Sequence, residues 1–123
     1  MATAAALNLI VIYSPDIERA CQFYSALGMA FTKEKHGNGP EHYAAASGAI
    51  VLEIYPADEA ASSICNRLGF RVQGLDELLP MLTTLGGTTV AMPKDSPWGR
   101  RAVMSDPDGR RVELTELSME HSP

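Results

Sequence analysis

The stretch Asp106-Pro-Asp-Gly-Arg-Arg-Val-Glu-Leu114 combines a turn with the start of a β-strand. Proline and glycine stand in Asp106-Pro-Asp-Gly109 where a tight turn favours them. After the turn, Val112 and Leu114 alternate with polar neighbours, which is typical of a strand with one buried face. We therefore expect two adjacent strands, 100–105 and 111–115, joined by this turn.

Upstream of this turn, the sequence predicts two more strands and a helix. Residues 67–72 and 88–92 have strand character. Residues 75–85 have helical spacing, and Gly86-Gly87 follows them as a stop signal. The segment 66–117 is therefore predicted to have the order βαβββ.

The first half of the chain, residues 7–56, shows the same order. A helix is expected to open at Pro15 or Asp16 and to end at Gly28. Leu27-Gly28 aligns with Leu85-Gly86, and Ile17 aligns with Leu75 at the same offset. The four predicted strands of this half are 7–13, 30–35, 42–47 and 49–55.

Two copies of βαβββ are the simplest explanation of this repeat. With 57–65 as a linker, residues 1–123 have the size of one domain. We expect an α+β fold in which the repeats form a curved eight-stranded mixed sheet, an open barrel, around a central cleft. One main helix per repeat should cover the outside.

Composition and charge restrict the possible partners. A hydrophobic fraction of 46% with 20% charged residues is typical of a soluble globular protein. The 15 acidic and 10 basic residues give a net charge of −5, which repels nucleic acid and anionic membranes. Two cysteines make no disulfide framework, and no apolar run is long enough to span a bilayer. We expect a cytoplasmic protein without nucleic-acid or membrane partners.

Strand alternation separates a helix-packed face from an open face. The first should carry apolar residues such as Ile12, Ile54 and Leu114. The open face mixes charged, phenolic and apolar groups, a composition that fits a ligand cavity. Its predicted members are Leu9, Val11, Tyr13, Val51, Glu53, Tyr55, Arg67, Gly69, Arg71, Arg111, Glu113 and Thr115.

Several motifs together resemble the vicinal oxygen chelate superfamily, which includes glyoxalase I, extradiol dioxygenases, fosfomycin-resistance enzymes and bleomycin-resistance binding proteins. The resemblance extends from about residue 7 to residue 116 and implies the fold more strongly than a reaction. It rests on the βαβββ repeat and on Ser14-Pro-Asp-Ile-Glu-Arg19, Phe23-Tyr24, Leu27-Gly28, Leu52-Glu53 and the stretch 106–114.

The resemblance also implies where a metal would bind. Metal-dependent members take one ligand from the first strand and one from the last strand of each half; here these positions are Leu9, Glu53, Arg67 and Glu113. Leucine has no lone pair, and a guanidinium only donates hydrogen bonds. We therefore expect no metal or cofactor at this site. Instead, Arg67 is expected to bridge Glu53 and Glu113.

Other candidates lie in loops and strand ends. His36 and His42 flank a glycine-rich turn and could reach one ligand, but no third metal ligand is visible nearby in the sequence. His42 is either a polar cavity residue or a strand histidine with a local hydrogen bond. Trp98 is either a pocket anchor or a cap on the core. Arg110 and Arg111 follow the turn as solvated charges, with Arg111 facing the cleft if the register holds.

These observations favour a homodimer that binds or sequesters a small organic ligand. The alternative is a glyoxalase-like lyase or isomerase, with Glu53 or Glu113 as general base and Arg67 polarising an oxyanion. A sensor or regulatory domain is a third reading. The predicted ligand-binding residues are Tyr13, Glu53, Tyr55, Arg67, Glu113, His42, Trp98 and Arg111.

Overall fold

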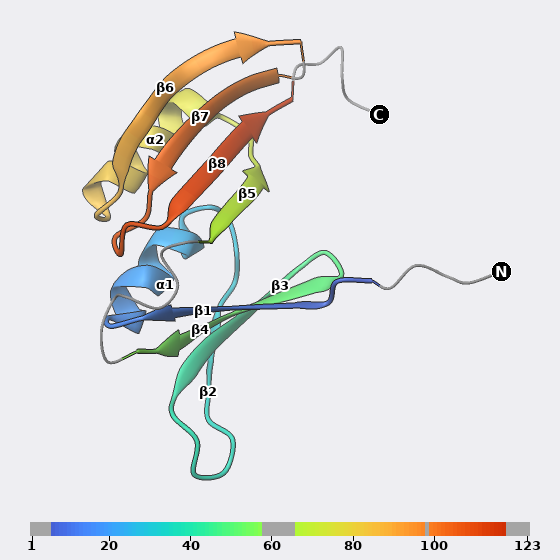
Figure 1. Ribbon diagram of the computed structural model, residues 1–123, viewed down its shortest axis with the longest axis vertical. Helices are drawn as coiled ribbons and strands as arrows, with labels where there is room; N and C mark the ends of the chain where they lie inside the picture. Colours follow the sequence, from blue (N-terminus) through green and yellow to red (C-terminus); the bar gives the residue numbers. More distant parts are fainter. Residues whose placement is uncertain (1–5, 58–65, 98, 118–123) are drawn as a thin grey trace, which may run out of the picture.

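The computed structural model describes residues 6–57, 66–97 and 99–117, and it contains two βαβββ units (Figure 1). The elements of the first unit are β1 (Leu9–Ser14), α1 (Ile17–Ser25), β2 (Thr32–Glu34), β3 (His42–Ser47) and β4 (Ile50–Pro56). Those of the second are β5 (Arg67–Arg71), α2 (Leu75–Thr84), β6 (Thr88–Ser96), β7 (Gly99–Ser105) and β8 (Arg111–Glu116). The predicted α+β class and the repeat are confirmed.

Each unit contributes its own four-stranded mixed sheet. Sheet A has the order β1-β4-β3-β2, and sheet B has the order β5-β8-β7-β6. In both, the first and last strands of the unit pair in parallel and the other pairs are antiparallel. Within the described part of the chain the two sheets are separate, so the eight strands form neither one continuous sheet nor a closed barrel.

Each helix begins with a distinct capping residue. Asp16 is the N-cap of α1, and its Oδ1 accepts a hydrogen bond of 3.1 Å from the backbone N–H of Arg19. Gly74 precedes α2 in the left-handed region, at φ 64°, and its N–H donates to Glu116 Oε2 at 2.6 Å. Pro80 is accommodated within α2. Neither helix of the described residues is long and apolar enough to cross a membrane.

One apolar core joins the two units. The helix-side residues of sheets A and B and the buried stripes of both helices belong to a single cluster. In α1, Phe23 and Tyr24 are fully buried, and Tyr24 lies against Phe70 of sheet B with ring centroids 6.0 Å apart. Because α1 packs against both units, it lies between the two sheets, as Figure 1 shows.

The turn at 106–109 is part of this junction. Asp106 Oδ1 accepts hydrogen bonds from the backbone N–H groups of Asp108 and Arg110, at 2.9 and 3.0 Å. Asp106 Oδ2 accepts from Tyr24 Oη at 2.6 Å and pairs with Arg110 Nη1 at 2.6 Å. Arg110 is 0% exposed and also donates to the carbonyl of Tyr13 at 2.9 Å. The expectation of a solvated Arg110 was therefore wrong, because this guanidinium joins the units from inside.

Candidate functional site

The open face of sheet A gathers several of the predicted ligand-binding residues. The strand register pairs Val11 with Glu53 and Tyr13 with Tyr55. It pairs Ala44 with Glu53, so His42, two residues before Ala44, lies on the same face. The rings of Tyr13 and Tyr55 lie 6.3 Å apart at 50°. Tyr13, His42, Glu53 and Tyr55 therefore share one surface, which faces away from α1.

His42 is the most enclosed residue of this face. Its side chain is 1% exposed, and its ring stacks on Tyr55 with centroids 4.1 Å apart and planes 9° from parallel. Nδ1 lies 3.1 Å from the carbonyl oxygen of Pro40. Nε2 faces two carboxylates, with Glu34 Oε1 at 3.5 Å and Glu53 Oε2 at 3.9 Å. His42 is thus a buried polar residue with acidic neighbours.

The open face of sheet B is dominated by arginines around one carboxylate. Arg67 Nη1 lies 3.0 Å from Glu113 Oε2. Arg101 contacts Oε1 of the same carboxylate through Nη2 at 2.7 Å and Nε at 3.0 Å. These contacts hold the pKa of Glu113 below its ordinary value, with the hydrogen bonds from Arg101 as the largest cause. Arg111 lies on the same face and donates to Ser105 Oγ at 2.5 Å.

The charge arrangement differs from the expected bridge. Among the described residues, Arg67 pairs with Glu113 and not with Glu53. Arg101 contacts the other carboxylate oxygen of Glu113, and the sequence did not identify this residue as part of the site. The turn at 106–109 sets the register in which Val103 pairs with Glu113. Arg101, two residues before Val103, therefore lies on the same face of β7. That register was the signal that could have identified Arg101.

The four usual metal-ligand positions lie in two half-sites. Leu9 and Glu53 belong to the open face of sheet A, whereas Arg67 and Glu113 belong to the open face of sheet B. The opposite faces of both sheets pack into the shared core. Both open faces are therefore directed away from that core, and no described contact joins Glu53 to the arginine cluster.

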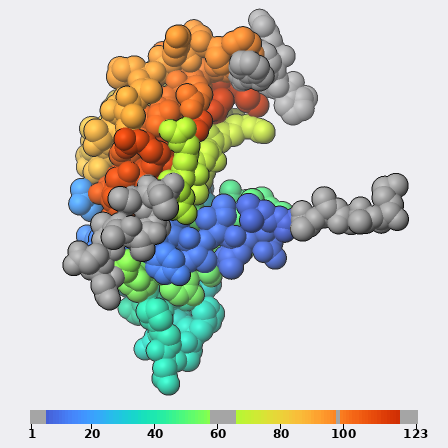
Figure 2. All heavy atoms as spheres, viewed as in Figure 1, coloured from blue at the N-terminus to red at the C-terminus, as the bar shows by residue number. Residues whose placement is uncertain are grey.

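A pocket of about 200 Å³ lies between the units, on the helix side of sheet A. Figure 2 shows a hollow between β5 and β1, two of the strands that line this pocket. Among the predicted site residues that the structure describes, Arg67 alone lines this pocket. The other lining residues are Ile10, Met29, Ser47, Ile50, Leu52, Leu68, Gly69 and Phe70.

Trp98 and the greater part of the predicted linker, 58–65, lie outside the described residues. Glu34 was missed by the sequence analysis, yet it stands directly opposite His42 in the β2–β3 pair. The signal was available, because a hairpin closed around the glycine-rich turn brings the end of one strand to the start of the next.

Two βαβββ units with open mixed-sheet faces define the glyoxalase type of fold. The sequence matches the family model of the Glyoxalase/Bleomycin resistance protein/Dioxygenase superfamily over residues 6–114, and the chain belongs to this superfamily. No curated protein matched the sequence.

Solved structures agree on the fold. A glyoxalase/bleomycin resistance protein/dioxygenase family enzyme from Burkholderia phytofirmans PsJN superposes with a TM-score of 0.73 at 20% identity, covering 93% of this chain and 100% of that one. TnmS3, an antibiotic binding protein from Streptomyces sp. CB03234, gives 0.68 at 24% identity, with 96% and 100% covered. The hypothetical protein SA1046 from S. aureus gives 0.74 at 17% identity, with 94% and 96% covered.

Proposed function

We propose that this protein binds a small organic molecule without transforming it. The pairing of Glu113 with Arg67 and Arg101 carries the proposal. A carboxylate held by two guanidinium groups is a poor general base, because its pKa is lowered. It is also poorly placed to ligate a divalent ion, since the arginines already neutralise it. With leucine at position 9, the usual metal site is proposed to be lost and no cofactor is needed.

The ligand is proposed to lie between two copies of the chain. Each chain offers one open face with tyrosines and one with arginines, and both are directed away from its own core. Leu9 and Tyr13 leave apolar surface exposed on the first. In a homodimer, sheet A of one protomer could face sheet B of its partner. Such a cavity would be lined by Tyr13, His42, Glu53, Tyr55, Arg67, Arg111 and Glu113, with Trp98 as a further candidate.

This cavity suits a ligand with an aromatic or conjugated body and polar substituents. Tyrosine rings provide flat apolar contacts, and the guanidinium groups provide hydrogen-bond donors. The antibiotic binding by TnmS3 supports this class of ligand. The net charge of −5 supports the absence of nucleic-acid partners, and a cytoplasmic location remains a prediction.

A thermal-shift screen of the full chain against aromatic antibiotics and metabolites tests the binding. We expect a ligand that raises the melting temperature and is recovered chemically unchanged by mass spectrometry. Tyr55→Ala and Arg67→Ala should each weaken its binding. Glu77→Gln, on the exposed side of α2, should leave it unchanged and serves as the control. Conversion of the ligand, or binding insensitive to both alanine variants, would contradict the proposal.

The assembly can be tested separately. Light scattering at tens of micromolar should give the mass of a dimer. The interface of this dimer is expected to bury at least about 1,000 Å² in total. If sites form between protomers, a mixed dimer of the Tyr55→Ala and Arg67→Ala chains carries one fully intact site. Mixing the two variants should therefore restore part of the binding. A monomeric mass, or no restoration on mixing, would overturn this arrangement.

Glu53 favours a second candidate, a glyoxalase-like lyase or isomerase. Among the described residues Glu53 pairs with no arginine, and its side chain is 18% exposed. A carboxylate free of guanidinium partners remains available as a general base. If the ligand is converted, Glu53→Gln should abolish turnover and leave binding in place, whereas Glu77→Gln should change neither.

A further inference from the structure

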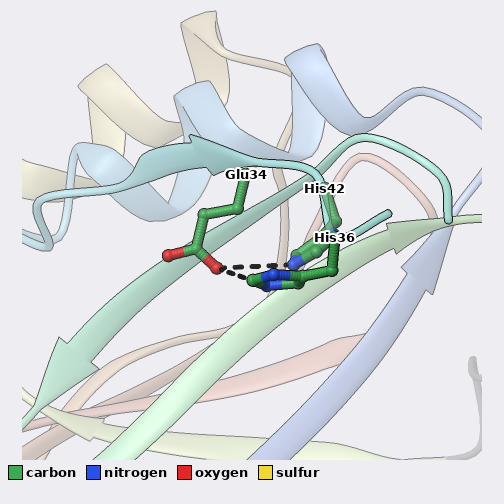
Figure 3. A group of neighbouring side chains, drawn as sticks. All are labelled: Glu34, His36 and His42. Atoms are coloured by element: carbon green, nitrogen blue, oxygen red, sulfur yellow. Dashed lines mark ion pairs between the residues drawn. The ribbon is translucent and has the colours of Figure 1, made fainter. Parts of the chain in front are cut away.

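Glu34, His36 and His42 form a cluster outside the usual ligand positions of this fold (Figure 3). Glu34 ends β2 and pairs with His42 at the start of β3. His36 lies two residues beyond Glu34, in the loop that joins the strands. One potential ligand atom from each residue lies within 4.8 Å of the other two. The hairpin thus gathers two imidazoles and a carboxylate at one point.

The orientation of His42 is fixed by its surroundings. A carbonyl oxygen only accepts hydrogen bonds, so the contact of Nδ1 with Pro40 places a hydrogen on Nδ1. In the neutral ring, Nε2 then carries the lone pair. Stacking on Tyr55 holds the ring in this orientation. A histidine whose Nδ1–H donates to a backbone carbonyl is a common arrangement for metal ligation through Nε2.

Nε2 of His42 is a buried atom without a hydrogen-bond partner. It faces Glu34 Oε1 at 3.5 Å and Glu53 Oε2 at 3.9 Å. A lone pair directed at carboxylate oxygens is unfavourable unless a positive centre lies between them. That centre is either a proton on Nε2 or a metal ion.

The distances favour an ion. Glu34 Oε1 lies 3.4 Å from His36 Nε2 and 3.5 Å from His42 Nε2. These separations exceed the usual length of an N–H···O hydrogen bond, about 2.9 Å. Two ligands bound about 2.1 Å from a tetrahedral ion lie about 3.4 Å apart. The carboxylate of Glu34 therefore lies from each imidazole at the separation expected of two ligands on one small cation, and the two imidazole nitrogens lie within 4.8 Å of each other.

We propose that Glu34, His36 and His42 bind a divalent transition metal such as Zn²⁺ or Ni²⁺. Two imidazoles and a carboxylate form a donor set that suits these ions. His36 is 72% exposed, so the ion can enter from solvent and keeps an open side there. The site shares His42 with the small-molecule cavity proposed above, but all three of its ligands come from one chain, so metal binding needs neither the organic ligand nor a second copy.

The test is titration of Zn²⁺ and Ni²⁺ into the full chain, without an affinity tag and freed of metal by a chelator that is then removed. Calorimetry should give one ion per chain with a Kd below about 100 μM. The ion should also raise the melting temperature. A Kd above that value, or a stoichiometry far from one, would overturn the proposal.

Variants locate the ion. Glu34→Gln changes a partly exposed position and His36→Ala an exposed one, so the fold should persist, and each should weaken binding by at least about tenfold. Glu41→Gln removes a nearby carboxylate that contacts Lys33 at 3.9 Å instead of the cluster, and should bind like the parent. Glu113→Gln should also bind like the parent. Unchanged affinity in His36→Ala, or lost affinity in Glu113→Gln, would place the ion elsewhere and refute the site.

Discussion

Tyr24 of α1 donates a hydrogen bond of 2.6 Å to Asp106 in the turn between β7 and β8. The bond crosses from the first βαβββ unit to the second, and both residues are buried. Arg110 pairs with the same carboxylate from the other side. The signature at 106–114 therefore stabilises the junction of the units, because Asp106 connects a helix of one half to a turn of the other.

Tyr24→Phe should lower the free energy of unfolding by about 1–3 kcal/mol, because it deletes a buried hydrogen bond to a charged acceptor. Denaturant unfolding followed by circular dichroism measures the change. Tyr43→Phe is the matched control, since its hydroxyl donates to Glu18 at an exposed position, and it should cost less than about 1 kcal/mol. Equal losses in the two variants would contradict a special role for the junction.

Arg110→Met should be more damaging, at about 3–5 kcal/mol, because it leaves the buried carboxylate of Asp106 without its cation. Arg111→Met, the neighbouring exposed arginine, should stay within about 0.5 kcal/mol of the parent. Adding Asp106→Asn to Arg110→Met should recover part of the loss, which a double-mutant cycle would measure. No recovery would mean that the guanidinium acts through packing alone.

Gly87→Ala should destabilise the protein by about 1–3 kcal/mol through overpacking. A Cβ at Gly87 would lie 2.7 Å from Phe23 Cε2 and 2.9 Å from the carbonyl oxygen of Leu82. Gly69→Ala is the control, because a Cβ there meets nothing within 4 Å and neither glycine has a positive φ. Thermal unfolding should give a lower melting temperature for Gly87→Ala than for Gly69→Ala. Equal melting temperatures would show that Phe23 of α1 packs less closely on Gly87 than described.

The stability of the protein should depend on Glu113 in acid. Its pKa in the folded state is lowered, chiefly by Arg101, so folding favours the ionised carboxylate. This contribution is present above the pKa of an unfolded glutamate, about 4.3, and is lost as the pH falls from there through the lower folded value. The free energy of unfolding, measured from pH 7 to pH 3, should fall less for Glu113→Gln than for the parent. Glu77→Gln should follow the parent, and a parallel profile for Glu113→Gln would contradict the pairing.

Much of the fold was determined by local sequence patterns. The helix predicted to open at Pro15 or Asp16 begins at Ile17 with Asp16 as its cap, and the predicted strand 42–47 is observed at His42–Ser47. The separation of faces was also predicted correctly, since Tyr13 and Tyr55 pair on one face while Ile12 and Ile54 are buried on the other. These features follow from residues close in sequence, because helical spacing, caps and period-two alternation require no distant contact.

Tertiary structure alone decided how these pieces meet. The burial of Arg110 depends on distant residues, because its guanidinium donates to the carbonyl of Tyr13 and its partner Asp106 accepts from Tyr24. The same holds for the separation of Glu53 from Arg67, which depends on α1 packing between two sheets. The meeting of Glu34 with His42 required the strand register, since a shift of one residue would direct one of them to the opposite face. Alternation assigns each side chain to a face, whereas packing and register determine which faces and charges come together.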